Sequence, residues 1–208
     1  MRRFVIARKA LPSKEGHSKA GRAMRKRWIG ALVLAVAAVA AYAGSVRGTV
    51  RATPATPPPC FSSETLSKAT FGRISLHVQT QDPQFWNAVV QTEGDSDLFV
   101  QRVSWNPGVP ACSGLTPSSG WHMHPGPSFI NVTEGSVTVY RGDDPACTPH
   151  VFTAGTVNNS FMEIAGVVHI VRNETDAPAK TIAVQLIPKG ADRRQDAPDP
   201  GNCHFPSP

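Results

Sequence analysis

Short segments in which apolar and polar residues alternate make up most of the chain after residue 70. Side chains along a β-strand point to opposite faces with a period of two, so this alternation predicts strands. In the first segment, for example, Ile74, Leu76 and Val78 share one face. Further strands are expected at residues 86–92, 97–105, 150–152, 169–173 and 180–188.

Residues 128–141 contain two such runs on either side of Glu134 and Gly135, which predicts a hairpin with its turn at that point. Turn-forming residues separate the runs at intervals of about ten residues, a spacing typical of sandwiches and barrels. Only residues 61–69 and 83–86 indicate short helices. We therefore predict an all-β domain.

The positive charge of the chain is confined to its first quarter. Residues 1–51 contain twelve Lys and Arg and one acid, Glu15, whereas residues 52–208 contain nine Lys and Arg and fourteen acids; the two parts, +11 and −5, give the net charge of +6. A nucleic-acid-binding domain needs a basic surface on its folded part. Because the folded part here is acidic, we expect no nucleic-acid partner.

The basic leader has the features of a targeting segment. A basic triplet at residues 25–27 precedes an uncharged, largely apolar run at 28–43, which ends in Ala-Tyr-Ala. This order is typical of a secretory signal peptide. The run is short for a membrane span, which takes about 20 residues, but an uncleaved N-terminal membrane anchor is the alternative. Residues 1–43 are thus a signal peptide or an anchor, and the protein is expected to be extracytoplasmic, either secreted or anchored to the cell membrane.

Composition divides the rest of the chain into three parts. Residues 44–63 are expected to form a Pro-rich linker, because a dense run of prolines favours an extended, semi-rigid chain. The globular domain is expected at residues 64–199, which is long enough for one hydrophobic core. Residues 200–208 form a C-terminal tail.

Four cysteines suit an exported protein, whose thiols can oxidise. They allow three pairings. We favour Cys147–Cys203, which would attach the tail to the loop after residue 141, and Cys60–Cys112, which would tie the linker to the loop before the histidine motif. None has the C-x-x-C spacing of a zinc or redox site, so a structural role is expected.

Three histidines indicate a binding site. His122 and His124 lie at positions i and i+2, so their side chains point to the same face of a strand. If His169, on a later strand, closes over that face, three neutral imidazoles meet in the arrangement that a divalent metal ion with open coordination positions needs. The alternative is a metal-free interior in which these histidines are held by hydrogen bonds.

The motifs around these histidines resemble the two motifs of the cupin superfamily. The first motif is Gly, five residues, His-x-His, three or four residues, Glu, six residues and Gly; the second is Gly, five residues, Pro-x-Gly, two residues, His, three residues and Asn. The matching residues are His122, His124, Gly135, Gly166, His169 and Asn173. The departures are Thr116, Ser128, Asn158 and Ile164.

The resemblance covers about residues 66–190. The sequence Gly-Trp-His-x-His-Pro-Gly-Pro around the first two histidines is similar to that of a small bacterial single-domain cupin subgroup. It implies a double-stranded β-helix, or jelly-roll barrel, with a metal ion inside. It also implies that the protein can pair as a homodimer.

The residue at the motif's Glu position is Ser128, which shares a face with His122 and His124 and is expected beside the metal. Its neutral hydroxyl is a poor ligand. The absence of the Glu carboxylate makes the net charge of the site more positive by one and disfavours hard ions such as Mn. Glu163 and Gln185 are candidates for a substitute ligand or an outer contact. However, Glu163 is expected on a solvated loop, and the pattern favours an outward-facing Gln185.

The sequence thus predicts a metal-binding protein with a three-histidine site open to a small-molecule ligand. The ion is divalent (Zn, Fe, Ni, Cu or Mn), and the membrane is contacted only through the N-terminal segment. Two alternatives remain: a metal-dependent enzyme of dioxygenase, isomerase or hydrolase type, and a metal-free structural or ligand-binding barrel. No catalytic residue is assigned.

Overall fold

The computed structural model describes residues 52–80 and 86–205. The predicted leader, residues 1–43, and the first part of the linker lie outside the described residues. Within the described ranges, the structure contains no helix with the length and apolar character needed to cross a bilayer.

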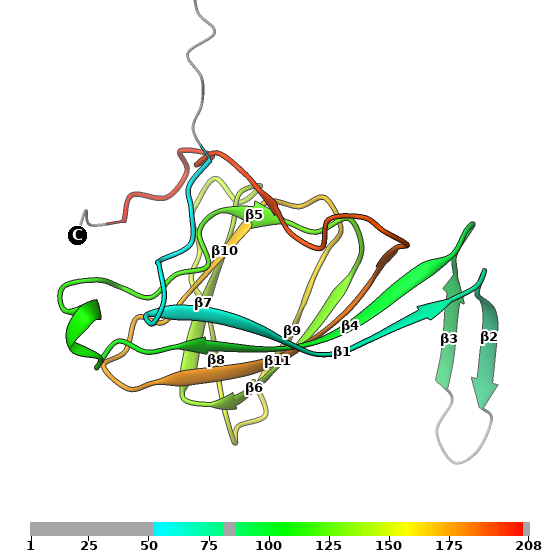
Figure 1. The fold of residues 1–208 in the computed structure, drawn as a ribbon, viewed down its shortest axis with the longest axis horizontal. Coiled ribbons are helices and arrows are strands. Elements are labelled where there is room, and N and C mark those ends of the chain that lie inside the picture. The colour runs from blue at the N-terminus through cyan, green and yellow to red at the C-terminus, as the bar shows by residue number, and fades with distance from the viewer. Residues whose placement is uncertain (1–51, 81–85, 206–208) are drawn as a thin grey trace, which may run out of the picture. The chain divides into compact units, whose positions relative to one another are not determined.

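Two five-stranded sheets face each other and form the barrel (Figure 1). The first sheet has the order β1-β4-β11-β6-β9. Its strands are β1 (Phe61–Phe71), β4 (Ser96–Trp105), β6 (Ser128–Glu134), β9 (Ser160–Glu163) and β11 (Ala179–Pro188). The second sheet has the order β12-β5-β10-β7-β8. Its strands are β5 (His122–Met123), β7 (Ser136–Arg141), β8 (His150–Thr153), β10 (His169–Arg172) and β12 (Gln195–Asp196).

Two smaller elements complete the described chain. Strands β2 (Ser75–Thr80) and β3 (Trp86–Gln91) form a two-stranded sheet of their own. A single 3-10 turn, η1 (Pro110–Cys112), precedes β5. The all-β jelly-roll prediction is therefore confirmed.

The space between the sheets is divided into an apolar part and a polar part. A buried cluster fills the apolar part: Trp105, Val132, Val137, Val139, Val171 and Ala179. Burying such side chains stabilises the fold by roughly 25 cal/mol per Å² of apolar surface removed from water. Along β11 the buried positions alternate, and they include the polar residues Thr181 and Gln185. These polar positions mark the part of the interior that is not a simple core.

Residues 61–69, expected to be helical, form most of strand β1 instead. The segment pairs with β4 along its whole length, antiparallel, from Phe61 opposite Trp105 to Phe71 opposite Ser96. This backbone pairing outweighs the local preference for a helix. The Phe61 and Trp105 rings also meet edge to face, with centroids 5.7 Å apart. Of the second expected helix, residues 83–85 lie outside the described residues and Trp86 begins β3.

The predicted hairpin at residues 128–141 is wrong in its pairing. Strands β6 and β7 follow each other around Gly135, but β6 pairs with β9 and β11, whereas β7 pairs with β8 and β10. The chain therefore crosses from one sheet to the other at Gly135. This residue has φ +66°, and an added Cβ would collide with the backbone of Pro178, which explains why only glycine fits.

Both predicted disulfides are present. Cys60–Cys112 and Cys147–Cys203 have Cα atoms 5.5 and 5.2 Å apart. The second fixes the tail against the outer face of β5, β10 and β7, where Trp121, Tyr140 and Ile170 are buried. The described part of the predicted linker also lies on the barrel: Thr53 N–H donates to the Ala197 carbonyl at 3.0 Å.

A buried carboxylate joins strands β1 and β4 to the end of β11. Asp97 is 1% exposed and accepts hydrogen bonds from Thr70 Oγ1 at 2.6 Å and Gly190 N at 3.0 Å. Lys68 Nζ lies 2.8 Å from the carboxylate. The contact with Lys68, followed by that with Thr70, holds the pKa of Asp97 well below its usual value.

This pKa sets a testable acid sensitivity. A carboxyl group whose pKa is depressed on folding stabilises the protein above its unfolded pKa, about 3.9, and loses that contribution as the pH falls towards the folded pKa. We expect Asp97→Asn to lower the Tm at pH 7 and to flatten the decrease in Tm between pH 4 and pH 2. Thermal unfolding followed by circular dichroism tests this. An unchanged Tm at pH 7 would contradict it, and Asp199→Asn, at an exposed position just before the tail, serves as control.

Candidate metal centre

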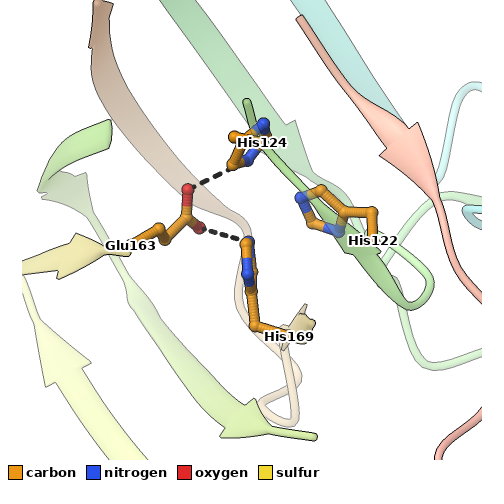
Figure 2. A group of neighbouring side chains, drawn as sticks. All are labelled: His122, His124, Glu163 and His169. Atoms are coloured by element: carbon orange, nitrogen blue, oxygen red, sulfur yellow. Dashed lines mark ion pairs between the residues drawn. The ribbon is translucent and has the colours of Figure 1, made fainter. Parts of the chain in front are cut away.

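The three predicted histidines converge inside the barrel (Figure 2). His122 on β5 and His169 at the start of β10 are direct cross-strand neighbours, and His124 follows β5 by one residue. Their ring centroids are 4.4 to 5.2 Å apart. All three side chains are buried, with at most 5% exposure.

A backbone carbonyl fixes the orientation of each ring. The Nδ1 atoms of His122, His124 and His169 lie 2.9, 2.7 and 2.8 Å from the carbonyl oxygens of Gly120, Arg193 and Val167. A carbonyl only accepts hydrogen bonds, so each Nδ1 carries the proton and each Nε2 is left as the ligand atom. Metal-binding histidines commonly have such an outer hydrogen bond, which sets the tautomer and the ring direction.

Glu163 completes the cluster, and the prediction that it is solvated is wrong. It ends strand β9, is 8% exposed and places its carboxylate between two of the rings (Figure 2). Oε2 is 3.1 Å from His124 Nε2, and Oε1 is 3.2 Å from His169 Nε2. One ligand atom from each of the four side chains lies within 4.8 Å of the others, so the group could hold a metal ion.

Strand pairing explains why the carboxylate is here. Ser128, at the position where the resemblance leads one to expect Glu, is the direct cross-strand partner of Glu163 on β9. The acidic side chain is therefore supplied by the neighbouring strand on the same sheet face. The sequence did not reveal this, because Met162 in β9 and Ile164 just after it are apolar but 56% and 48% exposed, while Glu163 points inward. Only the pairing of β6 with β9 could have indicated it.

Ser128 and Gln185 support the cluster from the same sheet. Ser128 is fully buried on the expected face and accepts a hydrogen bond from Gln185 Nε2 at 3.0 Å. Gln185 points inward, contrary to the expected outward direction, and its Nε2 is 3.2 Å from His124 Nδ1. Gln185, Ser128 and Glu163 thus form one row across β11, β6 and β9.

The electrostatics favour an ionised Glu163 carboxylate and a neutral His122 imidazole. Burial raises the pKa of Glu163, but His169 and His124 more than offset it, and the net pKa is well below the usual value. Burial lowers the pKa of His122, and His169 lowers it further. For His169, the effect of burial is outweighed by Glu163, which raises its pKa.

An unsatisfied nitrogen of His169 indicates whether the cluster fits a metal ion. His169 Nε2 is buried and has no hydrogen-bond partner, because its 3.2 Å approach to Glu163 Oε1 does not have hydrogen-bond geometry. A buried nitrogen without a partner costs free energy. A divalent cation would satisfy this nitrogen and the facing carboxylate together, so the donor set fits such an ion.

Two cavities reach these side chains. One, of about 180 Å³, has Glu163 and His169 in its lining. The other, of about 70 Å³, is lined partly by His122, His124, Glu163, Arg193 and Arg194. The cluster is therefore buried from bulk solvent and still accessible to a small molecule.

Comparison with known proteins supports the architecture. Residues 114–185 match the family described as Cupin domain. This range contains all three histidines and Glu163. No match was found among the curated proteins.

Solved structures are similar at low identity. An oxalate oxidase in complex with the substrate analogue glycolate has 20% identity and a TM-score of 0.34, with 42% of this chain and 41% of that chain covered. A cupin 2 conserved barrel domain protein from Leptotrichia buccalis has 16% identity and a TM-score of 0.37, with 63% and 43% covered. The polyketide cyclase RemF from Streptomyces resistomycificus has 15% identity and a TM-score of 0.37, with 50% and 64% covered.

The chain thus spans about two fifths of the length of the oxalate oxidase, 41%.

A glycine next to the cluster gives a structural test. A Cβ added at Gly126, in the turn between His124 and Ser128, would collide with the backbone of Leu186. Overpacking of this kind costs about 1–3 kcal/mol. We expect Gly126→Ala to lower the free energy of unfolding by that amount and to displace His124. Gly108→Ala, where an added Cβ meets nothing within 4 Å, is the control. Equal stability of the two variants in urea unfolding would contradict this packing.

Proposed function

We propose that this chain, which carries a cupin domain, is an exported or membrane-anchored protein that holds one divalent metal ion through His122, His124, His169 and Glu163. The ion keeps open positions for a small ligand. The observation that carries this proposal is the buried carboxylate of Glu163 between two imidazoles whose Nε2 atoms face it.

The carboxylate changes which metals the site suits. Three imidazoles alone favour Zn, Cu or Ni, and Ser128 adds no charge. Glu163 adds a hard, anionic oxygen donor, which restores affinity for Mn²⁺ and Fe²⁺. Four protein ligands leave two positions free in an octahedral shell.

The bound ion would polarise a ligand oxygen or lower the pKa of a bound water. The chain's own residues prepare the site for this. The carbonyls of Gly120, Arg193 and Val167 fix the three rings through Nδ1, so that each Nε2 is the atom offered to the ion. Phe161 and Ile130 add apolar wall to the cavity.

Export is supported by the two disulfides, since such bonds persist in oxidising compartments. The basic and apolar leader supports it as well. Cleavage or retention of that leader would decide between a secreted and an anchored protein.

Metal analysis tests the proposed ligand set. We expect close to one divalent ion per purified chain, little or none in His122→Ala, and an affinity lower by at least about tenfold in Glu163→Gln, since even outer contacts of metal sites contribute about 10–100-fold. Glu64→Gln is the matched control, because Glu64 is exposed and its ion pair is with Arg102.

Elemental analysis and competition with a chelating dye measure both quantities, and circular dichroism verifies folding. Full occupancy in Glu163→Gln with wild-type affinity would remove Glu163 from the ligand set. Absence of metal from the wild-type protein would leave the metal-free barrel.

Metal-dependent catalysis is the second candidate, favoured by the two cavities that both have Glu163 in their lining. If the protein is an oxygenase, the Fe²⁺-loaded form consumes O₂ when a small thiol or diketone is added, and His169→Ala abolishes the consumption. An oxygen electrode measures this. Uptake that is equal in the variant and in the wild type would come from free iron rather than from the centre.

A further inference from the structure

We infer that Arg193 and Arg194 form an anion-binding subsite beside the metal centre, and that the ligand of the site is a small organic carboxylate. This inference rests on the proposed metal centre and names the chemical class of its ligand.

The connection between β11 and β12 carries both arginines to the site. The Arg193 carbonyl accepts the hydrogen bond from His124 Nδ1 at 2.7 Å, so the backbone that orients this histidine also positions the guanidinium. Arg193 Nη1 donates to Gln185 Oε1 at 3.2 Å. Both arginines line the 70 Å³ cavity together with His122, His124 and Glu163.

The two arginines differ in how they are paired. Arg194 donates to the Ser119 carbonyl at 2.6 Å and pairs with Asp196 at 2.6 Å. For Arg193 the structure records only the amide oxygen of Gln185 as a side-chain partner, and no carboxylate among the described residues. A partly buried guanidinium without a carboxylate partner retains N–H groups for a ligand.

The charges lining the cavity add up to an excess of positive charge. The lining holds Arg193 and Arg194 and one carboxylate, Glu163, while Asp196 outside the lining offsets the charge of Arg194. Burial lowers the pKa of each arginine below its usual value. Glu163 lies close enough to both guanidinium groups to act in the opposite direction, but does not outweigh burial. A divalent ion would add two further positive charges. A bound anion would offset this excess, because charges taken out of water need a partner.

The walls and the size of the cavity restrict the anion. A volume of about 70 Å³ is space for roughly five water molecules. Much of the remaining wall is apolar and includes Phe61, Val103, Ile130 and Phe161. Phosphate has acceptor oxygens on all sides and would leave some of them against this wall. A carboxylate of two to four carbons places its oxygens on the planar guanidinium, as arginine favours, and its carbons on the apolar residues.

Calorimetric titration of the full-length, Zn²⁺-loaded protein tests the subsite. The probes are malonate, its neutral analogue malonamide, and inorganic phosphate. We expect malonate to bind at least about tenfold more tightly than the other two probes. Arg193→Gln should lower the affinity for malonate by about tenfold, as loss of a charge-assisted pair does. The malonate affinity of Arg193→Lys should lie between those of the wild type and Arg193→Gln. Arg102→Gln, an exposed arginine on β4 paired with Glu64, should match the wild type.

Metal content, measured on each variant, separates the two claims. If Arg193→Gln holds the same metal and binds malonate as tightly as the wild type, the subsite is refuted while the metal centre stands. Phosphate that binds as tightly as malonate refutes the carboxylate class. If the wild type holds no metal, the proposed function fails. The subsite is then decided by whether malonate raises the Tm of the metal-free wild type but not of Arg193→Gln.

Discussion

A buried carboxylate that needs positive partners is the constraint on which the rest of this structure depends. Taking a charged group out of water costs several kcal/mol unless it is paired and hydrogen-bonded. The Glu163 oxygens lie 3.1 Å from His124 Nε2 and 3.2 Å from His169 Nε2, and the buried His169 Nε2 has no hydrogen-bond partner, so a cation between these atoms would meet the requirement. Glu163 raises the pKa of His169, so this carboxylate stabilises positive charge on that ring. A divalent cation would take the same atoms as ligands.

The fold delivers this geometry by facing one row of side chains against another. Gln185, Ser128 and Glu163 are neighbours across three strands of the first sheet. His122 and His169 are neighbours in the second sheet. The interior is polar where these rows meet and apolar around Trp105 and Val132, so burial of the apolar cluster offsets the cost of the polar one. Outer contacts then fix the rows: the Arg193 carbonyl holds His124, and the two disulfides hold segments at the edge of the barrel.

Much of the fold could be predicted because strand alternation and cysteine placement are local signals. The convergence of His122, His124 and His169 followed from period-two geometry and the resemblance to cupins. Glu163 could not be predicted, because β9 exposes Met162 and buries the acid, the reverse of the usual pattern. The prediction that Gln185 faces outward was wrong for a similar reason, since the buried face of β11 carries polar and apolar residues in alternation. Residues 61–69 became a strand because pairing with β4 outweighs local preference. In each case a long-range contact decided the outcome.

The most direct test is a crystal structure of the metal-loaded protein with anomalous scattering recorded at the absorption edge of the ion. We expect a single strong peak at about 2.0–2.3 Å from the three Nε2 atoms and from an oxygen of Glu163. A peak coordinated by the histidines with Glu163 turned to solvent, or no peak between these side chains, would contradict it.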